Sequence, residues 1–203
     1  MIIRLYLDVK MTRPKTQSDD QVLEIAYRLM HADGPEALTF ERLARACGLS
    51  GSTLVQRFKS KTLLKQRALL YAWDGLDRKT DETARSVTKT PAGAIALLVA
   101  LSGGYGDIES YAEGLLVLRE DLRDPVLRAR GAAWKASLGR MLSDCFADVR
   151  GMPDDIGLLM ASHWQGSLLW WSFDPDDLDL IAYVEHSLRR FVSAITAGSA
   201  RAP

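Results

Sequence analysis

The sequence lacks most of the features that mark a secreted, membrane-bound or metal-binding chain. Its 203 residues include two cysteines, Cys47 and Cys145, and their wide separation fits neither a disulfide framework nor a zinc site. The longest apolar run, residues 94–101, is far shorter than the ~20 residues that a membrane-spanning helix needs. Residues 1–10 are apolar but have no signal-peptide core or cleavage site. These absences favour a cytoplasmic protein with no membrane partner.

The residue types that build catalytic or metal sites are scattered along the chain. His31, His163 and His186 fall in three different predicted helices, and no Ser/His/Asp or Cys/His order stands out. The acidic residues of 174–179 are better explained as complements to a helix dipole than as metal ligands. The glycines of 103–106 lack the Lys-Ser/Thr of a phosphate-binding loop. The sequence therefore predicts no enzyme, no metal and no cofactor.

The charges balance overall but are unevenly distributed. Residues 11–65 contain nine Lys and Arg against six Asp and Glu, whereas residues 66–203 contain 15 against 19. A mildly basic front and an acidic body suit a chain that touches nucleic acid at one end only.

Apolar residues recur at helical spacing along almost the whole chain, which predicts an all-α fold. Capping residues predict where helices begin: Ser18 with Gln21 forms a capping box, Thr39, Ser50 and Ser60 each precede an apolar stripe, and Thr90 precedes Pro91. We expect the polar residues 83–90 to separate two halves. Later helices are expected from about Ile108 to Leu122, Pro125 to Val149, Asp155 to Ser172, and onward from Asp174-Pro175.

The stretch 38–64 has the spacing of a helix-turn-helix. Ala44 is small enough for two helices to cross closely, Gly48 tolerates the positive φ of a tight turn, and Leu54 anchors the second helix. The alternative is a plain helical hairpin with a glycine turn and no DNA contact. The helix after the turn places small and polar residues outward, and such side chains suit a major groove.

With its flanking Phe58-Lys59-Ser60-Lys61 and Leu64, this stretch resembles the tetracycline-repressor (TetR) family of bacterial transcriptional regulators. Cys47 stands between Ala46 and Gly48, which departs from the family's Ala-Gly pair. The residues in register with that family's signature are Thr39, Leu43, Ala44, Ala46, Gly48, Leu49, Ser50, Thr53, Leu54, Phe58, Ser60, Lys61 and Leu64.

The resemblance implies which side chains meet DNA. Thr39 would cap the second helix beside a phosphate, Thr53 with its neighbours would face bases or backbone, and Lys61 would meet a phosphate. The expected DNA-binding residues are Thr39, Ser50, Ser52, Thr53, Val55, Gln56, Arg57, Lys59 and Lys61.

Four departures from the family pattern bear on DNA affinity. Val55 replaces the usual Tyr, and Arg57 replaces His or Tyr and compensates by its charge. Ser52 stands where Gly is frequent, and Glu41 stands where many members carry Arg. Val55 and Glu41 favour an alternative function, a helical sensor or interaction protein of the same fold with weak or no operator reading.

The last two predicted helices carry long apolar stripes. One short recognition helix makes too few base contacts alone, so we expect a homodimer formed by these helices as a four-helix bundle. The alternative is that both stripes belong to the core of one chain. The expected interface residues are Leu159, His163, Ser167, Trp171, Ile181, Leu188 and Ile195.

Aromatic residues in the middle helices predict a pocket for a small, largely apolar or aromatic effector. We expect Tyr111, Trp134 and Trp164 to line it, with ordinary aromatic core as the alternative.

The expected domains are an extension at 1–11, a three-helix helix-turn-helix DNA-binding domain at 12–65, and a larger helical effector-binding and dimerisation domain at 66–203. The expected function is that of a dimeric ligand-responsive regulator, a repressor that binds an inverted-repeat operator of double-stranded DNA through residues 50–58.

Overall fold

The computed structural model describes residues 17–104, 107–175 and 179–199. These ranges contain nine α-helices, one short 3-10 helix and no strand, which confirms the expected all-α fold. The elements in chain order are α1 (Asp19–Asp33), η1 (Pro35–Ala37), α2 (Phe40–Cys47), α3 (Gly51–Phe58), α4 (Lys61–Ser86), α5 (Pro91–Ser102), α6 (Ile108–Arg123), α7 (Pro125–Asp144), α8 (Ile156–Trp171) and α9 (Leu180–Ser199).

Side-chain caps begin the helices at the predicted residues. The hydroxyls of Ser18, Thr39, Ser50, Ser60 and Thr90 each accept a hydrogen bond from the backbone N–H three residues later, at 3.1–3.2 Å. Each such cap stabilises its helix by about 1 kcal/mol because it satisfies a backbone donor that has no partner within the helix. The helix starts expected at these five residues and the capping box at Ser18 are confirmed.

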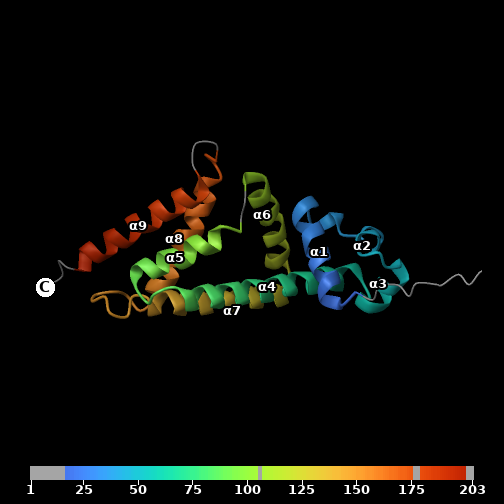
Figure 1. Cartoon of the computed structure of the whole chain (residues 1–203), viewed down its shortest axis with the longest axis horizontal. Helices are drawn as coiled ribbons and strands as arrows, with labels where there is room; N and C mark the ends of the chain where they lie inside the picture. The colour runs from blue at the N-terminus through green and yellow to red at the C-terminus, as the bar shows by residue number, and fades with distance from the viewer. Residues whose placement is uncertain (1–16, 105–106, 176–178, 200–203) are drawn as a thin grey trace, which may run out of the picture.

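The first apolar core joins α1, α2 and α3 to the first half of α4. Helix α1 packs along α4, and α2 and α3 close the cluster at the end of the molecule opposite α9 (Figure 1). Val22, Met30, Leu43, Leu54 and Leu64 are fully buried there. The helix-turn-helix is therefore packed against α1 and α4 through a shared apolar core and is not joined to them by a flexible linker.

Helix α4 runs on without interruption into a second core. Leu64, Ala68 and Leu69 belong to the first cluster, whereas Leu76 and Ala84 pack against the second. The expected separation of the halves at residues 83–90 is therefore wrong, because the helix continues to Ser86 through most of that polar stretch. The polar residues there are the exposed face of a helix whose other face is buried.

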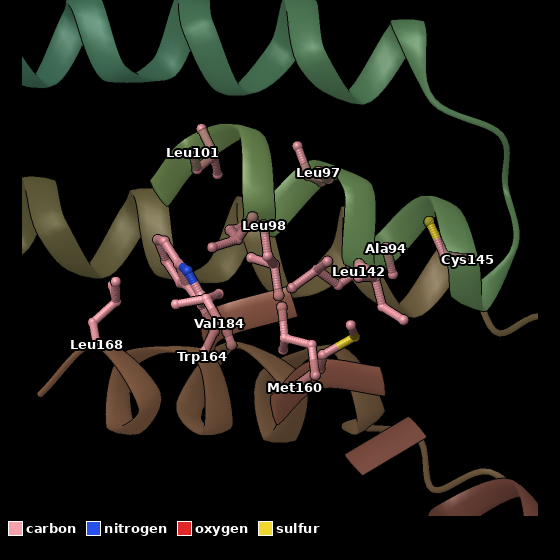
Figure 2. Close-up of a cluster of buried hydrophobic side chains, with 14 of the residues drawn as sticks. Ala94, Leu97, Leu98, Leu101, Leu142, Cys145, Met160, Trp164, Leu168 and Val184 are labelled. Atoms are coloured by element: carbon pink, nitrogen blue, oxygen red, sulfur yellow. The ribbon is translucent and has the colours of Figure 1, made fainter. Parts of the chain in front are cut away.

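The second core lies among α5, α7, α8 and α9. Figure 2 shows Leu98, Leu142, Met160, Trp164 and Val184 converging from these helices, and all five are buried. Helices α7 and α8 approach closely at Gly157, where an added Cβ would lie 1.9 Å from the carbonyl oxygen of Gly139. A glycine at this position is required by the backbone contact.

Two predicted boundaries differ from the structure. Helix α7 ends at Asp144 rather than near Val149, since the following residues form turns. Helix α9 begins at Leu180 rather than at Asp174-Pro175, and Asp179 caps it by accepting from the N–H of Ala182 at 2.8 Å. Some residues considered in the sequence analysis lie outside the described residues. They are the predicted extension 1–11, Arg13, Lys15, Tyr105, the acidic residues at 176 and 177, and Leu178.

None of the helices in the described ranges is long and apolar enough to cross a membrane.

A buried carboxyl group connects α6 to the middle of α4. Asp121 is 8% exposed and accepts a hydrogen bond from the indole N–H of Trp73 at 3.2 Å. The pKa of Asp121 is raised to about 6, chiefly by burial and also by the nearby carboxylates of Asp124 and Glu120, while the hydrogen bond from Trp73 opposes the shift. Burial raises the pKa of the Tyr27 phenol on α1, and the Asp121 charge adds to that shift. At neutral pH the ionised Asp121 carboxylate therefore destabilises the folded protein.

We predict that Asp121→Asn stabilises the protein increasingly as pH rises from about 4 to 7. Between its ordinary pKa and about 6, native Asp121 holds a proton that the unfolded chain has lost, so the free energy of unfolding falls as pH rises. The variant loses this dependence and can still accept from Trp73. Urea unfolding across this range should show a stability difference that grows by up to roughly 3 kcal/mol. A difference that stays constant with pH would contradict this account of Asp121.

Candidate nucleic-acid interface

Helices α2 and α3 meet in a tight turn with the predicted chemistry. Gly48 ends α2 in the left-handed region at φ 64°, and both its N–H and that of Leu49 donate to the carbonyl oxygen of Ala44. Nothing lies within 4 Å of an added Cβ at Gly48, so the turn needs glycine for its backbone angle and not for space. Leu54 and Phe58 then anchor α3 in the first core. The Ala44, Gly48 and Leu54 spacing thus produces the helix-turn-helix geometry.

The outer face of α3 is built of small or uncharged side chains. Ser52, Val55 and Gln56 are exposed, and Gly51 has open space around it. The Ser50 hydroxyl lies 2.9 Å from the Ser52 hydroxyl and 2.7 Å from that of Thr53, besides capping the helix. Ser52, Val55 and Gln56 of the residues predicted to bind DNA therefore lie on one surface of α3. Ser50 and Thr53 also form hydrogen bonds that stabilise the start of this helix.

Arg57 is held against α1 instead of extending outward beside Gln56. Its Nε donates to Asp19 Oδ1 at 2.8 Å, and its side chain is 22% exposed. Asp19 also accepts from Arg67 at 2.9 Å, so one carboxylate bridges two guanidinium groups. These arginines hold the pKa of Asp19 below its usual range, chiefly through the hydrogen bond from Arg57. Arg57, expected to bind DNA, is thus paired within the protein.

Lys61, the residue in register with the family's phosphate contact, also has a partner within the protein. Its Nζ donates to Glu36 Oε2 and to the Glu36 carbonyl oxygen, both at 3.2 Å. Lys65 lies 3.4 Å from the same carboxylate and 2.8 Å from Glu120 Oε2 on α6. The exposed Lys59 ends α3 at φ 67°, and its N–H donates to the carbonyl oxygen of Val55.

The acidic partners Asp19 and Glu36 were not predicted as parts of this surface. They lie 38 and 25 positions from the basic residues that they bind, so no local spacing in the sequence indicates the pairing. Glu41, which stands where many family members carry Arg, forms an exposed pair with Arg45 at 2.9 Å. Thr39 caps α2 and is exposed at the same end of the protein.

A groove of about 450 Å³ lies where the first helices meet the body. None of the predicted effector residues lines it. Its lining residues are Glu36, Lys61, Thr62, Lys65, Gln66, Leu69, Glu120, Arg123, Asp124, Pro125 and Leu127.

The three aromatic residues predicted to line an effector pocket are packed within the body. Trp164 is 2% exposed and donates to Ser102 Oγ at 2.8 Å, inside the cluster of Figure 2. Tyr111 lies edge-on to Trp171, with ring centroids 6.2 Å apart. Trp134 donates to Thr80 Oγ1 at 3.1 Å. The structure thus places all three in packed surroundings.

The seven predicted interface residues divide between surface and core. Leu159 is exposed, whereas Ser167, Trp171 and Leu188 are buried in the chain's own core. His163 stacks on Phe191 with ring centroids 4.6 Å apart, and its Nε2 lies 2.9 Å from Ser187 Oγ. Ile181 and Ile195 are half-buried. Within the part of the chain that the structure describes, no three His, Cys, Asp or Glu residues are placed to hold a metal ion.

Residues 22–67, from the first turn of α1 into α4, match the family model "Bacterial regulatory proteins, tetR family". This part of the chain is similar to that family. The match covers the helix-turn-helix and the helices that support it, so the TetR resemblance inferred from residues 38–64 is confirmed.

Several solved structures, among them a TetR family transcriptional regulator, share the fold along most of the chain. A transcriptional regulator from Rhodococcus sp. Rha1 has a TM-score of 0.72 at 17% identity, covering 92% of this chain and 100% of that chain. AibR, in complex with isovaleryl coenzyme A and operator DNA, has a TM-score of 0.59 at 20% identity, covering 83% and 94%. PfmR, a TetR family transcriptional regulator from Thermus thermophilus, has a TM-score of 0.55 at 22% identity, covering 83% and 97%. Comparison with curated proteins gives no match.

We predict that Asp19→Asn strengthens binding to duplex DNA. The substitution removes a negative charge beside α3 and frees Arg57 and Arg67 for phosphates. The affinity for a mixed-sequence duplex should rise by roughly three- to tenfold at low salt, with a steeper salt dependence, as measured by fluorescence anisotropy.

Asp20→Asn is the matched control, since this exposed neighbour carries the same charge and forms no ion pair with an arginine of the described residues. Equal effects of the two substitutions would mean that release of the arginines plays no part.

Proposed function

We propose that this protein is a TetR-family regulator, a dimeric, ligand-responsive repressor that binds an inverted-repeat operator through α3. The observation that carries the proposal is the helix-turn-helix itself. Its second helix is anchored by Leu54 and Phe58 and exposes an outer face of hydroxyl, amide and small apolar groups. Such a face suits the major groove, whose base edges offer donors, acceptors and methyl groups.

Phosphate contacts in this proposal come from the rim of the same surface. Thr39, Lys59 and Lys61 lie at helix ends, where N–H groups and cations favour an anion. Arg57 and Lys61 would exchange Asp19 and Glu36 for phosphates on binding. Each exchange breaks an ion pair within the protein, and the free energy lost with that pair lowers the affinity for every DNA sequence. Contacts with the bases then give one sequence its higher affinity.

The dimer in this proposal forms on the exposed side of α8. The predicted residues Ser167, Trp171 and Leu188 are buried within one chain, so they would pack beneath the interface and would not contact the partner. The side chains that would meet the partner follow helical spacing along α8 and just beyond it, and α9 would complete a four-helix bundle. The exposed apolar residues are Leu158, Leu159, Leu169, Trp170 and Phe173, at 38–70% exposure.

The effector in this proposal is a small, largely apolar or aromatic molecule bound in the body, with Tyr111, Trp134 and Trp164 as contacts. AibR, which shares the fold, is described with isovaleryl coenzyme A and operator DNA together. An effector would separate the packed aromatic side chains. It would thereby shift the equilibrium between two conformations of the dimer that differ in the distance between the two α3 helices. The domain limits that accompany the proposal are 12–65 for DNA binding and 66–203 for effector binding and dimerisation.

The alternative function is a sensor or interaction protein that keeps the fold without operator reading. Val55 and Glu41 are the observations in its favour. Val55 offers no hydrogen bond to a phosphate, and the Glu41 carboxylate is 84% exposed and repels one.

We predict that the purified protein enriches one inverted repeat from a random duplex library, and that raising the salt weakens its binding. Lys61→Ala should weaken binding to all sequences and lower the slope of log affinity against log salt by about one for each half-site, because a phosphate contact is lost. Gln56→Ala should instead change which bases are enriched.

Enrichment of no sequence by a folded protein would contradict the repressor proposal and support the sensor alternative. An affinity that Lys61→Ala leaves unchanged would contradict the docking of α3 and the start of α4 onto DNA.

We predict that the wild-type protein is a dimer and that Leu159→Glu converts it to a monomer, because a buried unpaired carboxylate is costly. Analytical ultracentrifugation measures the change, and the monomer should bind the selected repeat at least tenfold more weakly. Leu122→Glu is the control, since Leu122 is 61% exposed on α6, away from α8. A wild-type monomer, or a Leu159→Glu dimer, would contradict this interface.

A further inference from the structure

Val55 is an apolar side chain on the exposed face of α3. It is 45% exposed, while Leu54 and Phe58 of the same helix are buried. Its neighbours on the outer face are Gly51 one turn earlier and Ser52 three residues earlier. An isolated apolar residue is ordinary on a protein surface, but this one lies at the centre of the surface that would enter the major groove.

Three features of α3 restrict the position of the Val55 methyl groups. Leu54 and Phe58, fully or almost fully buried, set the rotation of α3 about its axis. The carbonyl oxygen of Val55 accepts from the N–H of Lys59 at 2.8 Å, which holds the last turn of the helix. A β-branched side chain has little rotamer freedom on a helix, so little entropy is lost when it makes a contact.

The space around Val55 is open on the side of Gly51. A Cβ built at Gly51 would meet nothing within 4 Å, so bare backbone borders the valine there. A base edge can therefore approach Val55 closely without displacing another side chain. The hydroxyl of Ser52 and the amide of Gln56 lie on adjacent positions of the same face and supply the polar contacts that valine lacks.

The base edge that suits such a side chain follows from chemistry. In the major groove, thymine is the base that presents a methyl group, whereas guanine, adenine and cytosine present donors and acceptors. An apolar side chain over a polar edge removes water from that edge and returns no hydrogen bond, which is unfavourable. The contact of valine with the thymine methyl is favourable because both surfaces are apolar.

We propose that Val55 is a specificity-determining residue that reads the C5-methyl group of one thymine in each half-site of the operator. This inference rests on the proposed function, because it requires α3 to enter the groove. The identity of one base pair in each half-site would thus depend on a methyl–methyl contact without a hydrogen bond. A 5-methylcytosine presents the same group and is expected to substitute in part.

The test is a uracil scan of the duplex that the protein selects. Each thymine is replaced in turn by deoxyuracil, which removes the methyl group and keeps the base pair. Wild-type affinity should fall by about fourfold at one thymine in each half-site, as expected for one buried methyl group, and change little elsewhere. For Val55→Ala, the loss at that thymine should shrink to below about 1.5-fold, while the rest of the profile is unchanged.

Leu63→Ala provides the matched control. Leu63 is also 45% exposed and apolar, but it lies on α4 outside the recognition helix. This variant should retain the fourfold uracil effect. Circular dichroism of both variants checks that α3 remains folded, which is expected because neither side chain is buried.

The outcomes separate the inference from the function on which it rests. If no duplex is enriched, the repressor proposal fails and the inference fails with it. If a repeat is enriched but its uracil profile is identical for the wild type and Val55→Ala, the inference alone is overturned. If the uracil effect is abolished equally by Leu63→Ala, the methyl contact belongs to α4 and not to Val55.

Discussion

The structure depends on one continuous helix that contributes to both apolar cores. Leu64 and Leu69 of α4 pack under the helix-turn-helix, and Leu76 packs in the body, with no linker between them. The orientation of α3 relative to α8 and α9 is therefore fixed by the direction of α4 (Figure 1). Two contacts from α6 hold the first half of this helix, the hydrogen bond between Trp73 and Asp121 and the ion pair between Lys65 and Glu120. Helix α6 is thus bonded directly to the helix that supports α3.

The basic surface around α3 is neutralised by the protein's own carboxylates. Asp19 bridges Arg57 and Arg67, and Glu36 binds Lys61, so three of the cations near the helix-turn-helix are paired within the protein. These pairs are partly exposed, and each is worth little to folding in water. In the proposed function, phosphates would displace these pairs on binding. A protein with zero net charge would then gain its DNA affinity from a few exchanged ion pairs and from the shape and chemistry of α3.

Features encoded within a few residues were predictable from the sequence, and features that depend on distant contacts were not. The caps, the turn at Gly48 and the anchor at Leu54 follow from local chemistry. The length of α4 was underestimated because its polar residues 83–86 form the exposed side of a helix. The pairing of Arg57 with Asp19 spans 38 positions, and the same apolar stripe that predicts a dimer also predicts a core. Apolar spacing identifies a buried face, but it does not indicate whether the same chain or a second chain covers it.

The most direct test of the account is to locate α3 on DNA. A cysteine-tethered iron chelate, which cleaves nearby strands, is attached to a Thr62→Cys variant bound to the selected duplex. Thr62 is exposed beside Lys61, while the native Cys47 and Cys145 are each 4% exposed and protected from labelling. The account predicts two cleavage sites placed symmetrically about the centre of the repeat, and none from the same label at Asp148→Cys, an exposed position in the turn after α7. Cleavage from position 148, or uncut DNA with the label at position 62, would contradict it.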